Sequence, residues 1–391
     1  MKSEWQTVRA ADFMDFNPRL SIKKETVATK ISMDKLRPFT KAVPSVEQAE
    51  FSGGTKFANG DTIMARITPC LENGKTAFVD CLRENEIAFG STEFIVLRAK
   101  PGVSDPQFVY YLATSPEFRN VAIKSMVGSS GRQRVQQPVL ENLELTVPKL
   151  PEQEKIGHFL AELDDKIALN ERVNDNLYDL VNTLYTKLFK DTDCEMTTVE
   201  DYVDCIYSGG TPATSNMAYW NGNLNWLSSG ETRNRFVIST EKTITQLGAD
   251  NSSTKSAQKY DIVIASAGQG FTRGQTSMLL LNTYINQSVI VLHAKKTVLP
   301  YLFWNLTNRY DDLRAISDSS SIRGSLTTKM LSKLKIPKVE DSLILKFSEY
   351  AWSIIPQIEN NLIENKRLTD LRDSLLPKLM SGEIDVSDIQ L

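Results

Sequence analysis

The chain has few of the residues from which metal centres and hydrolytic sites are built. Its 391 residues include two histidines, His158 and His293, and four cysteines, none of them in a CxxC pair. The composition therefore argues against a metal site and against a Ser/His/Asp triad. Apolar runs of about 18 residues are missing, and polar sequence follows Met1 directly, so we expect neither a membrane span nor a secretory signal. The few, scattered cysteines indicate free thiols in a reducing cytoplasm.

Three stretches approach catalytic motifs but lack an essential part of each. Gly74-Lys75-Thr76 ends like a P-loop, but Pro69 stands where the first glycine belongs. Residues 17–19 (NPR) lack the second proline and the aromatic residue of an amino-methyltransferase motif. Glu72 and Lys75 are one position off the nuclease Glu-x-Lys spacing. We therefore expect no catalytic residue, no metal and no cofactor on this chain.

Charge is distributed in alternating blocks. The net charge of the whole chain is −3. Residues 1–150 and 192–339 each carry +3, whereas residues 151–191 and 340–391 carry −4 and −5. Two mildly basic parts thus alternate with two acidic parts, which indicates that the two kinds of segment meet different partners.

The two acidic segments carry the periodicity of long helices. Apolar residues recur at alternating steps of three and four, which is typical of a helix that packs along another helix. The second pattern repeats the first at an offset of 191 positions, from Ile167 to Ile358, with two asparagines at equivalent places. Buried asparagine fixes register at a cost in stability. The predicted helix-pair seam is Leu163, Ile167, Asn170, Asn174, Leu177, Leu184, Ile354, Ile358, Asn361, Asn365, Leu368 and Leu375.

The same pattern predicts how these helices begin, end and pair. Pro151 is suited to a helix start, and a rise of about 1.5 Å per residue makes the first helix about 50–60 Å long. Pro356 and Pro377 fall inside the second pattern, where we expect kinks or early ends. With a pseudo-twofold axis near position 172, Asn170 faces Asn365 and Asn174 faces Asn361. Two unrelated surface helices are the alternative.

The two basic segments show the same order of predicted strands and helices. Strand-like runs at residues 60–65, 76–79 and 94–97 precede a helix at 106–114, and runs at 260–265, 277–281 and 288–292 precede a helix at 300–307. Each copy closes on a strand directly before its long helix. Tandem duplication explains the repeat. Domain termini usually lie close together, so the second helix should leave the second domain where the first helix enters it and run back antiparallel. We therefore predict an α+β fold with two similar α/β domains at opposite ends of an antiparallel, pseudo-twofold two-helix coiled coil.

Glycine- and serine-rich loops with polar and basic side chains occur at equivalent places in both copies. Such side chains can hold phosphates and contact base edges, and two domains a helix apart can reach major grooves about 34 Å apart. Mobile surface loops of no function are the alternative for any single loop. The candidate DNA contacts are Arg66, Thr68, Lys75, Ser129, Ser130, Arg132 and Arg134 in the first copy, and Gln269, Thr272, Arg273, Ser320 and Arg323 in the second.

The sequence resembles a known family over essentially its whole length. Residues 147–156 (VPKLPEQEKI), 208–212 (SGGTP) and 376–384 (LPKLMSGEI) are together similar to the specificity (S) subunits of bacterial type I restriction–modification enzymes. Residues 336–341 (IPKVED) depart from the Pro-Glu-Gln pattern of the first copy, which leaves the start of the second helix less defined. We interpret Thr211, Pro212 and Trp226 as structural.

The resemblance implies an organisation and a set of partners. It implies target-recognition domains over 1–150 and 191–339, a central spacer helix over 151–190 and a C-terminal spacer helix over 340–391. Each domain would recognise one half of a split, asymmetric sequence in double-stranded DNA. The helices would bind two methyltransferase (M) subunits that carry S-adenosylmethionine, joined by motor and nuclease (R) subunits. The chain itself would be non-catalytic and cytoplasmic. The recognition part of a fused methyltransferase or endonuclease, and a two-module protein-binding scaffold, are the alternatives.

Overall fold

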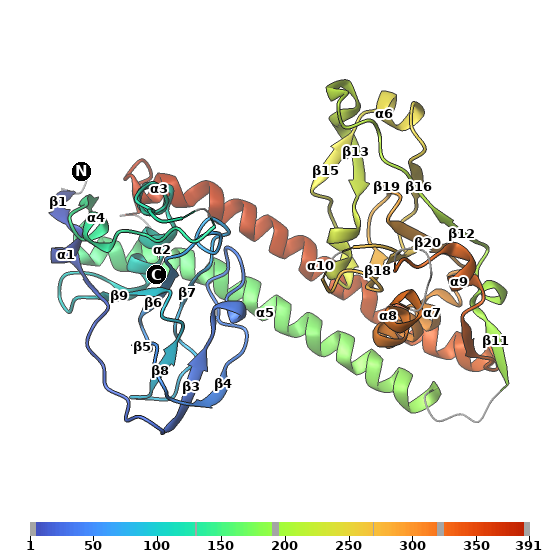
Figure 1. The fold of residues 1–391 in the computed structure, drawn as a ribbon, viewed down its shortest axis with the longest axis horizontal. Helices are drawn as coiled ribbons and strands as arrows, with labels where there is room; N and C mark the ends of the chain where they lie inside the picture. Colours follow the sequence, from blue (N-terminus) through green and yellow to red (C-terminus); the bar gives the residue numbers. More distant parts are fainter. Residues whose placement is uncertain (1–4, 130, 190–194, 269, 319–323, 387–391) are drawn as a thin grey trace. The chain divides into compact units, whose positions relative to one another are not determined.

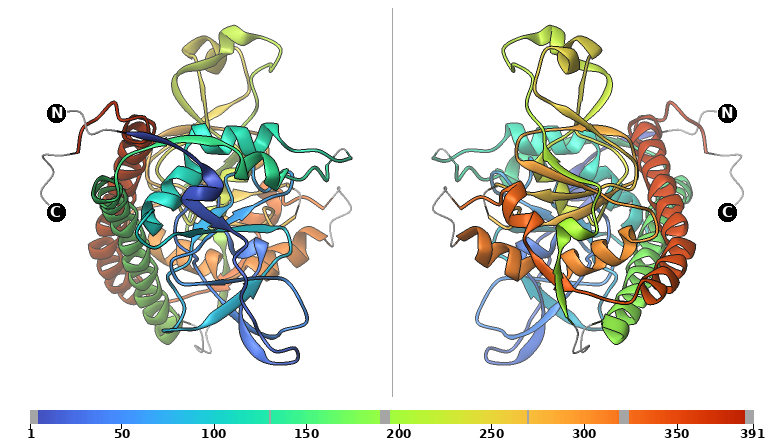
Figure 2. Two further views of the ribbon diagram at one scale, coloured as in Figure 1. Left: turned by 90° about the vertical axis from the view of Figure 1, so that its left-hand side faces the viewer. Right: turned by 90° about the vertical axis from the view of Figure 1, so that its right-hand side faces the viewer.

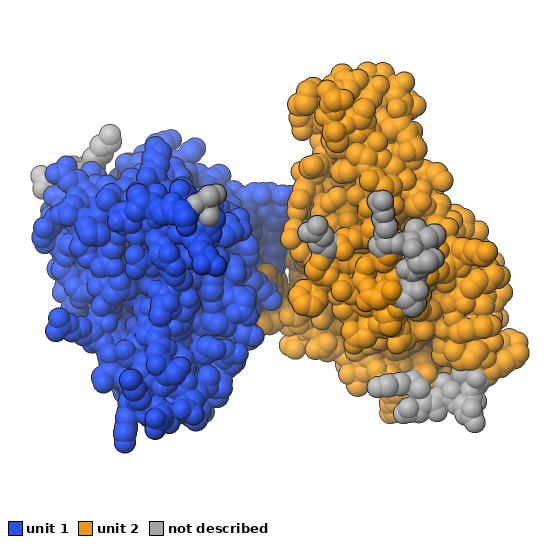
Figure 3. Space-filling view, in the orientation of Figure 1, with its two compact units in different colours: residues 1–169, 364–391 blue, residues 170–363 orange. Residues whose placement is uncertain are grey.

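The computed structural model describes residues 5–129, 131–189, 195–268, 270–318 and 324–386 (Figure 1). The chain forms two compact units, residues 1–169 with 364–391 and residues 170–363 (Figure 3). Each unit contains one of the predicted globular domains together with a part of both long helices.

The two long helices are α5 (Leu150–Phe189) and α10 (Asp341–Met380), each of 40 residues. In the first unit Arg372 of α10 pairs with Asp164 of α5, while the earlier Asn365 donates from Nδ2 to the carbonyl oxygen of the later Ile167 at 3.2 Å. Residue numbers therefore increase along α5 as they decrease along α10, so the two helices run antiparallel. Within each unit the two helices lie side by side and antiparallel, as predicted (Figure 2).

The expected early end of the second helix was wrong. Helix α10 runs through Pro356 and Pro377 to Met380. Each proline removes one backbone hydrogen bond, but Ile355 and Ile358 on either side of Pro356 are buried, as is Leu379 after Pro377. Packing of these buried neighbours offsets that loss, and the helix is continuous.

The first unit contains three small sheets. A ribbon pairs the first strand of the domain with its last, a central sheet has the order β2-β9-β6-β7, and an outer sheet has the order β4-β3-β8-β5. The strands are β1 (Gln6–Arg9), β2 (Met14–Phe16), β3 (Val27–Ile31), β4 (Glu47–Glu50), β5 (Thr55–Ala58), β6 (Thr62–Ala65), β7 (Thr76–Phe78), β8 (Ile87–Gly90), β9 (Phe94–Ala99) and β10 (Glu144–Val147). The short helices are α1 (Ala10–Phe13), α2 (Pro106–Thr114), α3 (Pro116–Lys124) and α4 (Gln137–Glu141), with a 3-10 turn η1 (Met33–Lys35).

The second unit repeats this arrangement. Its ribbon is β11-β21, its central sheet has the order β12-β20-β17-β18-β14, and its outer sheet has the order β15-β13-β19-β16. The strands are β11 (Met196–Thr198), β12 (Cys205–Ser208), β13 (Trp220–Leu227), β14 (Phe236–Val237), β15 (Lys242–Ile244), β16 (Lys255–Ala257), β17 (Ile262–Ala265), β18 (Thr276–Leu279), β19 (Thr283–Ile285), β20 (Val289–His293) and β21 (Lys335–Pro337). The short helices are α6 (Gln246–Asp250), α7 (Leu299–Thr307), α8 (Tyr310–Asp318) and α9 (Thr328–Ser332), with 3-10 turns η2 (Val199–Asp201), η3 (Met217–Tyr219) and η4 (Ser229–Arg233).

The matching strand orders confirm the internal duplication. In both outer sheets the second and third strands of the order run parallel, β3 with β8 and β13 with β19, among antiparallel neighbours. The predicted helices at 106–114 and 300–307 correspond to α2 and α7. In unit 2 the outer sheet stands out with α6 from the rest of the unit (Figure 2), and β14 has no counterpart among the described residues of unit 1. The fold is α+β: two similar α/β domains and an antiparallel helix pair.

Both long helices are built into the core of each unit. In the first unit Ile156 and Leu160 of α5 and Leu379 of α10 join the buried cluster of the domain. In the second unit Val181 and Tyr185 of α5 do the same, together with Phe347 and Ile355 of α10. Of the twelve predicted seam residues, only Asn170 and Ile358 are buried and the rest are half-buried. The apolar stripe that is fully covered therefore faces the domains rather than the partner helix.

No helix in the described part of the chain combines the length and apolarity needed to cross a membrane.

Candidate nucleic-acid interface

In the first unit, backbone hydrogen bonds join the two predicted loops. The amide N of Val135 donates to the carbonyl oxygen of Arg66 at 2.9 Å, and the amide N of Thr68 donates to the carbonyl oxygen of Gln133 at 3.0 Å. The loop after β6 and the Gly/Ser/Arg loop before α4 thus form one continuous surface. The bonded residues are 69 positions apart (Arg66 and Val135) and 65 positions apart (Thr68 and Gln133) in the sequence.

The second unit joins its two loops in the same way. The amide N of Leu326 donates to the carbonyl oxygen of Ser266 at 2.9 Å. The guanidinium of Arg273 also crosses between the loops, where it bonds the carbonyl oxygen of Gly324 and the carboxylate of Asp318. Each copy of the domain therefore carries one surface made of two loops, at equivalent places.

A third backbone contact establishes which residues are equivalent in the two copies. The amide N of Arg66 donates to the carbonyl oxygen of Glu93 at 2.9 Å, and the amide N of Ser266 donates to that of Ser288 at 2.8 Å. Together with the Val135 and Leu326 contacts, this matches Arg66 with Ser266, Glu93 with Ser288, and Arg134 with Ser325. The scaffold is the same, whereas the side chains that it displays differ.

Arg134 is held by a residue that the sequence did not single out. Its Nε lies 3.0 Å from both carboxylate oxygens of Glu93, and its Nη2 lies 2.6 Å from Oε1. The hydrogen bond from Arg134 lowers the pKa of Glu93 and outweighs the opposing effect of burial. The same bond raises the pKa of Arg134. Both shifts favour the charged forms of the two groups.

The other described candidates differ in whether their side chains are bonded, exposed or half-buried. Three have bonded side chains: Arg66 donates from Nη2 to the carbonyl oxygen of Val135 at 3.2 Å, Lys75 from Nζ to that of Met33 at 2.8 Å, and Thr68 to Glu72 Oε1 at 3.1 Å. Together with Arg273, these side chains brace the loops. Arg132 and Ser129 are exposed, and the amide N of Arg132 closes a turn onto the carbonyl oxygen of Ser129 at 3.0 Å. Thr272 is half-buried in the loop after β17. The candidates Ser130, Gln269, Ser320 and Arg323 lie outside the described residues.

An exposed aromatic residue in the second unit was also missed. The side chain of Phe271 is 81% exposed. The backbone around it is anchored, because Tyr310 donates from Oη to the carbonyl oxygen of Phe271 at 2.8 Å and Arg314 bonds the carbonyl oxygen of Gly270. An aromatic residue between two glycine-containing turns was the available signal. Phe271 thus stands on a loop that is fixed from α8.

Two of the residues interpreted as structural, Trp226 and Thr211, bond within the second unit. Trp226 is 4% exposed, stacks edge-on against Trp220 at 5.0 Å between ring centroids, and lies 3.4 Å through Nε1 from the carbonyl oxygen of Gly210. The hydroxyl of Thr211 bonds the side chain of Gln287. Trp226 therefore contributes to the core of the outer sheet in the second unit.

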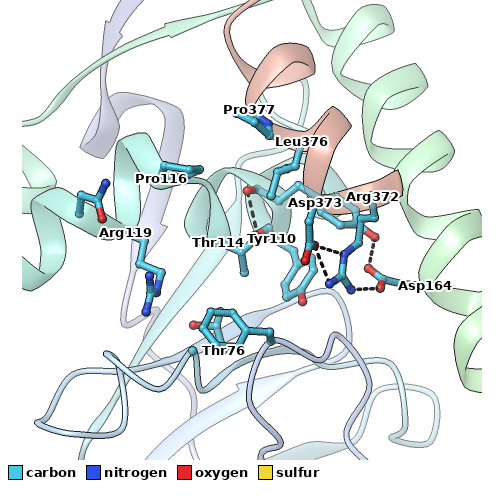
Figure 4. A pocket seen from close by; sticks show the side chains of 14 residues that line it. Thr76, Tyr110, Thr114, Pro116, Arg119, Asp164, Arg372, Asp373, Leu376 and Pro377 are labelled. Carbon is cyan, nitrogen blue, oxygen red and sulfur yellow. Dashed lines mark hydrogen bonds and ion pairs between the residues drawn. The ribbon is translucent and has the colours of Figure 1, made fainter. Parts of the chain in front are cut away.

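The first unit also has a cavity of about 310 Å³ where α10 meets the domain (Figure 4). A buried ion pair between Arg372 and Asp164 forms part of its wall, and Tyr111 donates from Oη to Asp164 Oδ2 at 2.7 Å. Burial opposes the charge of Arg372, but Asp164 and Asp373 outweigh it and raise its pKa. The lining residues are Phe39, Gly74, Thr76, Tyr110, Tyr111, Thr114, Pro116, Arg119, Asn120, Asp164, Arg372, Asp373, Leu376 and Pro377.

A second hollow, in unit 2, occupies the place related by the duplication. Thr276, Thr307 and Asn182 line it, and they are the counterparts of Thr76, Thr114 and Asp373. Its polar wall includes Arg233 and Arg235, and Arg235 stacks over the ring of Tyr178 at 4.3 Å. Among the described residues there is no group of three or more His, Cys, Asp or Glu side chains placed to hold a metal ion together.

The described chain thus combines a duplicated α/β domain, one two-loop surface in each copy and an antiparallel helix pair within each unit. Residues 2–178 and 192–368 each match the type I restriction modification DNA specificity domain. The chain therefore belongs to the family of type I restriction–modification specificity subunits.

Individual relatives agree with this assignment. The HindI specificity subunit of Haemophilus influenzae is 24% identical over 404 aligned positions, which cover 83% of this chain and 86% of the relative. The EcoAI specificity subunit of Escherichia coli is 39% identical over 104 residues, or 27% of this chain and 18% of the relative. The crystal structure of a type I S subunit from M. genitalium matches with a TM-score of 0.61 at 16% identity and covers 96% of both chains, which shows the shared fold.

Proposed function

We propose that this chain recognises a bipartite, asymmetric DNA sequence and directs methyltransferase and restriction subunits to it. The observation that carries the proposal is the pair of equivalent two-loop surfaces, one in each copy of the domain. Because the scaffold is the same and the displayed side chains differ, for example Arg134 against Ser325, the two halves of the target differ in sequence.

The distribution of charge supports separate roles for domains and helices. The domains are mildly basic, as a DNA-facing surface requires, whereas the helix segments are acidic and suit contacts with protein. In this proposal the helix pair sets the spacing between the half-sites and binds two methyltransferase subunits. Those partners bind S-adenosylmethionine and methylate adenine, and motor and nuclease subunits join them for cleavage. The chain is cytoplasmic and contributes no catalytic residue of its own.

The decisive experiment compares methylated adenines across the genome of the source organism with and without this gene. We expect one split motif to lose methylation when the gene is deleted and to regain it on complementation. Complementation with Arg132→Ala tests the first domain and with Thr272→Ala the second. Each variant is expected to extend methylation to sites that depart from the motif in the half bound by the mutated domain. Sites that depart from it in the other half should stay unmethylated. An unchanged methylome after deletion would refute the proposal.

Two further measurements separate the alternatives. Purified chain incubated alone with labelled S-adenosylmethionine and DNA is expected to transfer no label, and transfer would identify a fused methyltransferase. A gel-shift assay with the partner methyltransferase at low salt is expected to show a DNA complex that weakens steeply as salt rises. No complex even at low salt would favour the protein-binding scaffold.

A further inference from the structure

The Glu93–Arg134 clamp leaves a specific part of the arginine free. The bonds to Glu93 occupy Nε–H and one hydrogen of Nη2, which form one edge of the planar guanidinium. One hydrogen of Nη1 and the outer hydrogen of Nη2 point in parallel from the end of the group. The Arg134 side chain is 44% exposed and that of Glu93 is 24% exposed, so the pair is accessible. A two-donor fork of fixed orientation is thus displayed on the first domain.

The backbone that carries this fork is fixed on both sides. Arg134 forms an antiparallel bridge with Val127, with N–O distances of 2.9 and 3.1 Å, and a second bridge with Ile67. Glu93 stands directly before β9, and its carbonyl oxygen accepts the amide of Arg66. The arginine has therefore already lost much of its rotamer freedom, which lowers the entropy cost of binding.

Charge and geometry together select the partner of the fork. An arginine paired with a carboxylate has little net charge left, which weakens its attraction to phosphate. Its two end-on donors still match two acceptors side by side, and guanine presents such a pair, N7 and O6, in the major groove. Adenine offers one acceptor and one donor on that edge, and the donor opposes the fork.

The duplication offers an internal comparison. At the equivalent positions of the second domain stand Ser288 and Ser325, so both members of the pair are absent together. This is expected if Glu93 serves to orient Arg134. At these two positions the second domain therefore has no arginine–carboxylate pair.

From these observations we propose that Arg134, positioned by Glu93, recognises a guanine in the major groove of the half-site bound by the first domain. This inference rests on the proposed function. Arg134 is the specificity-determining residue, and Glu93 is a positioning residue that acts through it. The second half-site lacks a guanine read in this way.

The test uses the chain assembled with its methyltransferase partners. The split motif is first determined for the wild type, and affinities are then measured by competition with duplexes in which each base pair is replaced in turn. Arg134→Ala is expected to lose about 5- to 150-fold of discrimination at one G·C pair of the first half-site and to leave the second half-site unaffected. Arg134→Lys should lose most of it as well, because an ammonium cannot form the two parallel bonds.

Glu93 and the DNA are then varied separately. Glu93→Gln should relax preference at the same pair and at no other. A duplex with 7-deazaguanine at that pair removes N7, so the wild type should bind it more weakly, whereas Arg134→Ala should not distinguish it from guanine. The wild-type measurement in this comparison uses the intact protein and does not depend on whether a variant folds. Ser325→Ala, at the equivalent place in the second domain, is the matched control and should leave the first half-site preference unchanged.

The possible failures are distinguishable. If Arg134→Ala weakens all duplexes equally and reduces the salt dependence of binding, Arg134 contacts phosphate and this inference is wrong. Equal wild-type affinity for the guanine and 7-deazaguanine duplexes at every position of the first half-site also overturns it. If the wild-type complex has no sequence preference, the proposed function fails, and this inference fails with it.

Discussion

Nδ2 of Asn361 donates a hydrogen bond of 2.8 Å to Oδ1 of Asn174, between α10 and α5 in the second unit. Nδ2 of Asn174 in turn lies 3.3 Å from the carbonyl oxygen of Ile358. The sequence predicted that these two asparagines would face each other, and this is confirmed. The facing of Asn170 and Asn365 stays a prediction. A polar pair between otherwise apolar residues fixes the register of the helices.

The first prediction concerns this asparagine pair. Asn174→Leu or Asn361→Leu alone should lower the free energy of unfolding by about 1–2 kcal/mol, because the remaining amide loses its partner in a half-buried seam. The double variant should recover the loss, with a coupling energy of about 0.5–3 kcal/mol. Urea unfolding of all four proteins gives the cycle. Asn176→Leu, on the exposed face of α5, is the control. Additive single and double effects would contradict the prediction.

The second prediction concerns the buried pair of Asp164 and Arg372 in the first unit. At the positions related by duplication the second unit has Ile355 and Val181, both fully buried, and Trp304 stands in place of Tyr111. Arg372→Ala should cost about 3–5 kcal/mol, because it leaves the Asp164 carboxylate buried without its cation.

Replacing the whole network should behave differently. The variant Asp164→Ile/Arg372→Val/Tyr111→Phe imitates the apolar version in the second unit. It should be about as stable as the wild type or up to about 4 kcal/mol more stable. Chemical denaturation monitored by circular dichroism measures both variants. A triple variant as unstable as Arg372→Ala would show that the apolar version cannot pack in the first unit.

The third prediction compares two buried aspartates at equivalent strand starts. Oδ1 and Oδ2 of Asp61 accept from Nε and Nη2 of Arg98, both at 2.6 Å, whereas Asp261 Oδ1 lies 2.6 Å from Nδ1 of His293. Arg98→Ala should destabilise the protein by about 3 kcal/mol, because it leaves a buried carboxylate without its cation. His293→Ala, which removes a single hydrogen bond, should cost about 1–2 kcal/mol. Denaturant titrations measure the free energy of unfolding of each variant, with Arg83→Ala at an exposed position as the control. Equal losses in Arg98→Ala and His293→Ala would contradict the prediction.

The fourth prediction is a pH dependence at the start of the second domain. The hydroxyl of Thr197 and then the amide of Thr198 hold the pKa of Asp201 at about 2, below its ordinary value of 3.8. Because the pKa is lowered in the folded state, the stabilisation is fully present above pH 3.8 and disappears as the pH falls toward 2. The stability difference between the wild type and Asp201→Asn should therefore be constant from pH 5 to 7 and shrink below pH 3.8. A difference that does not change with pH would show that the carboxylate charge is not involved.

Periodicity and repetition made most of the fold predictable. The helix predicted at 106–114 is found with those bounds, because Asp105 caps it and Pro106 follows in the first turn. The helix pair could be predicted since its pattern extends over many turns. The path through the prolines could not, because it depends on buried neighbours such as Ile355.

The candidate interface was predicted only at the level of loops. A sequence shows which side chains are cationic, but not which carbonyl or carboxylate lies beside them. Lys75 was therefore predicted to contact DNA, whereas in the structure its ammonium donates to the carbonyl oxygen of Met33. Glu93 was overlooked because it lies 41 positions from Arg134, and only the folded sheet brings them together.

The ribbons β1-β10 and β11-β21 have a consequence for how this protein can change. Gln6 pairs with Val147, and Met196 pairs with Pro337, so the chain enters and leaves each domain at adjacent points. Everything between those points can grow, shrink or be replaced while the junction to the long helix stays the same. An exchanged domain that keeps this strand pair therefore meets its long helix through the same junction.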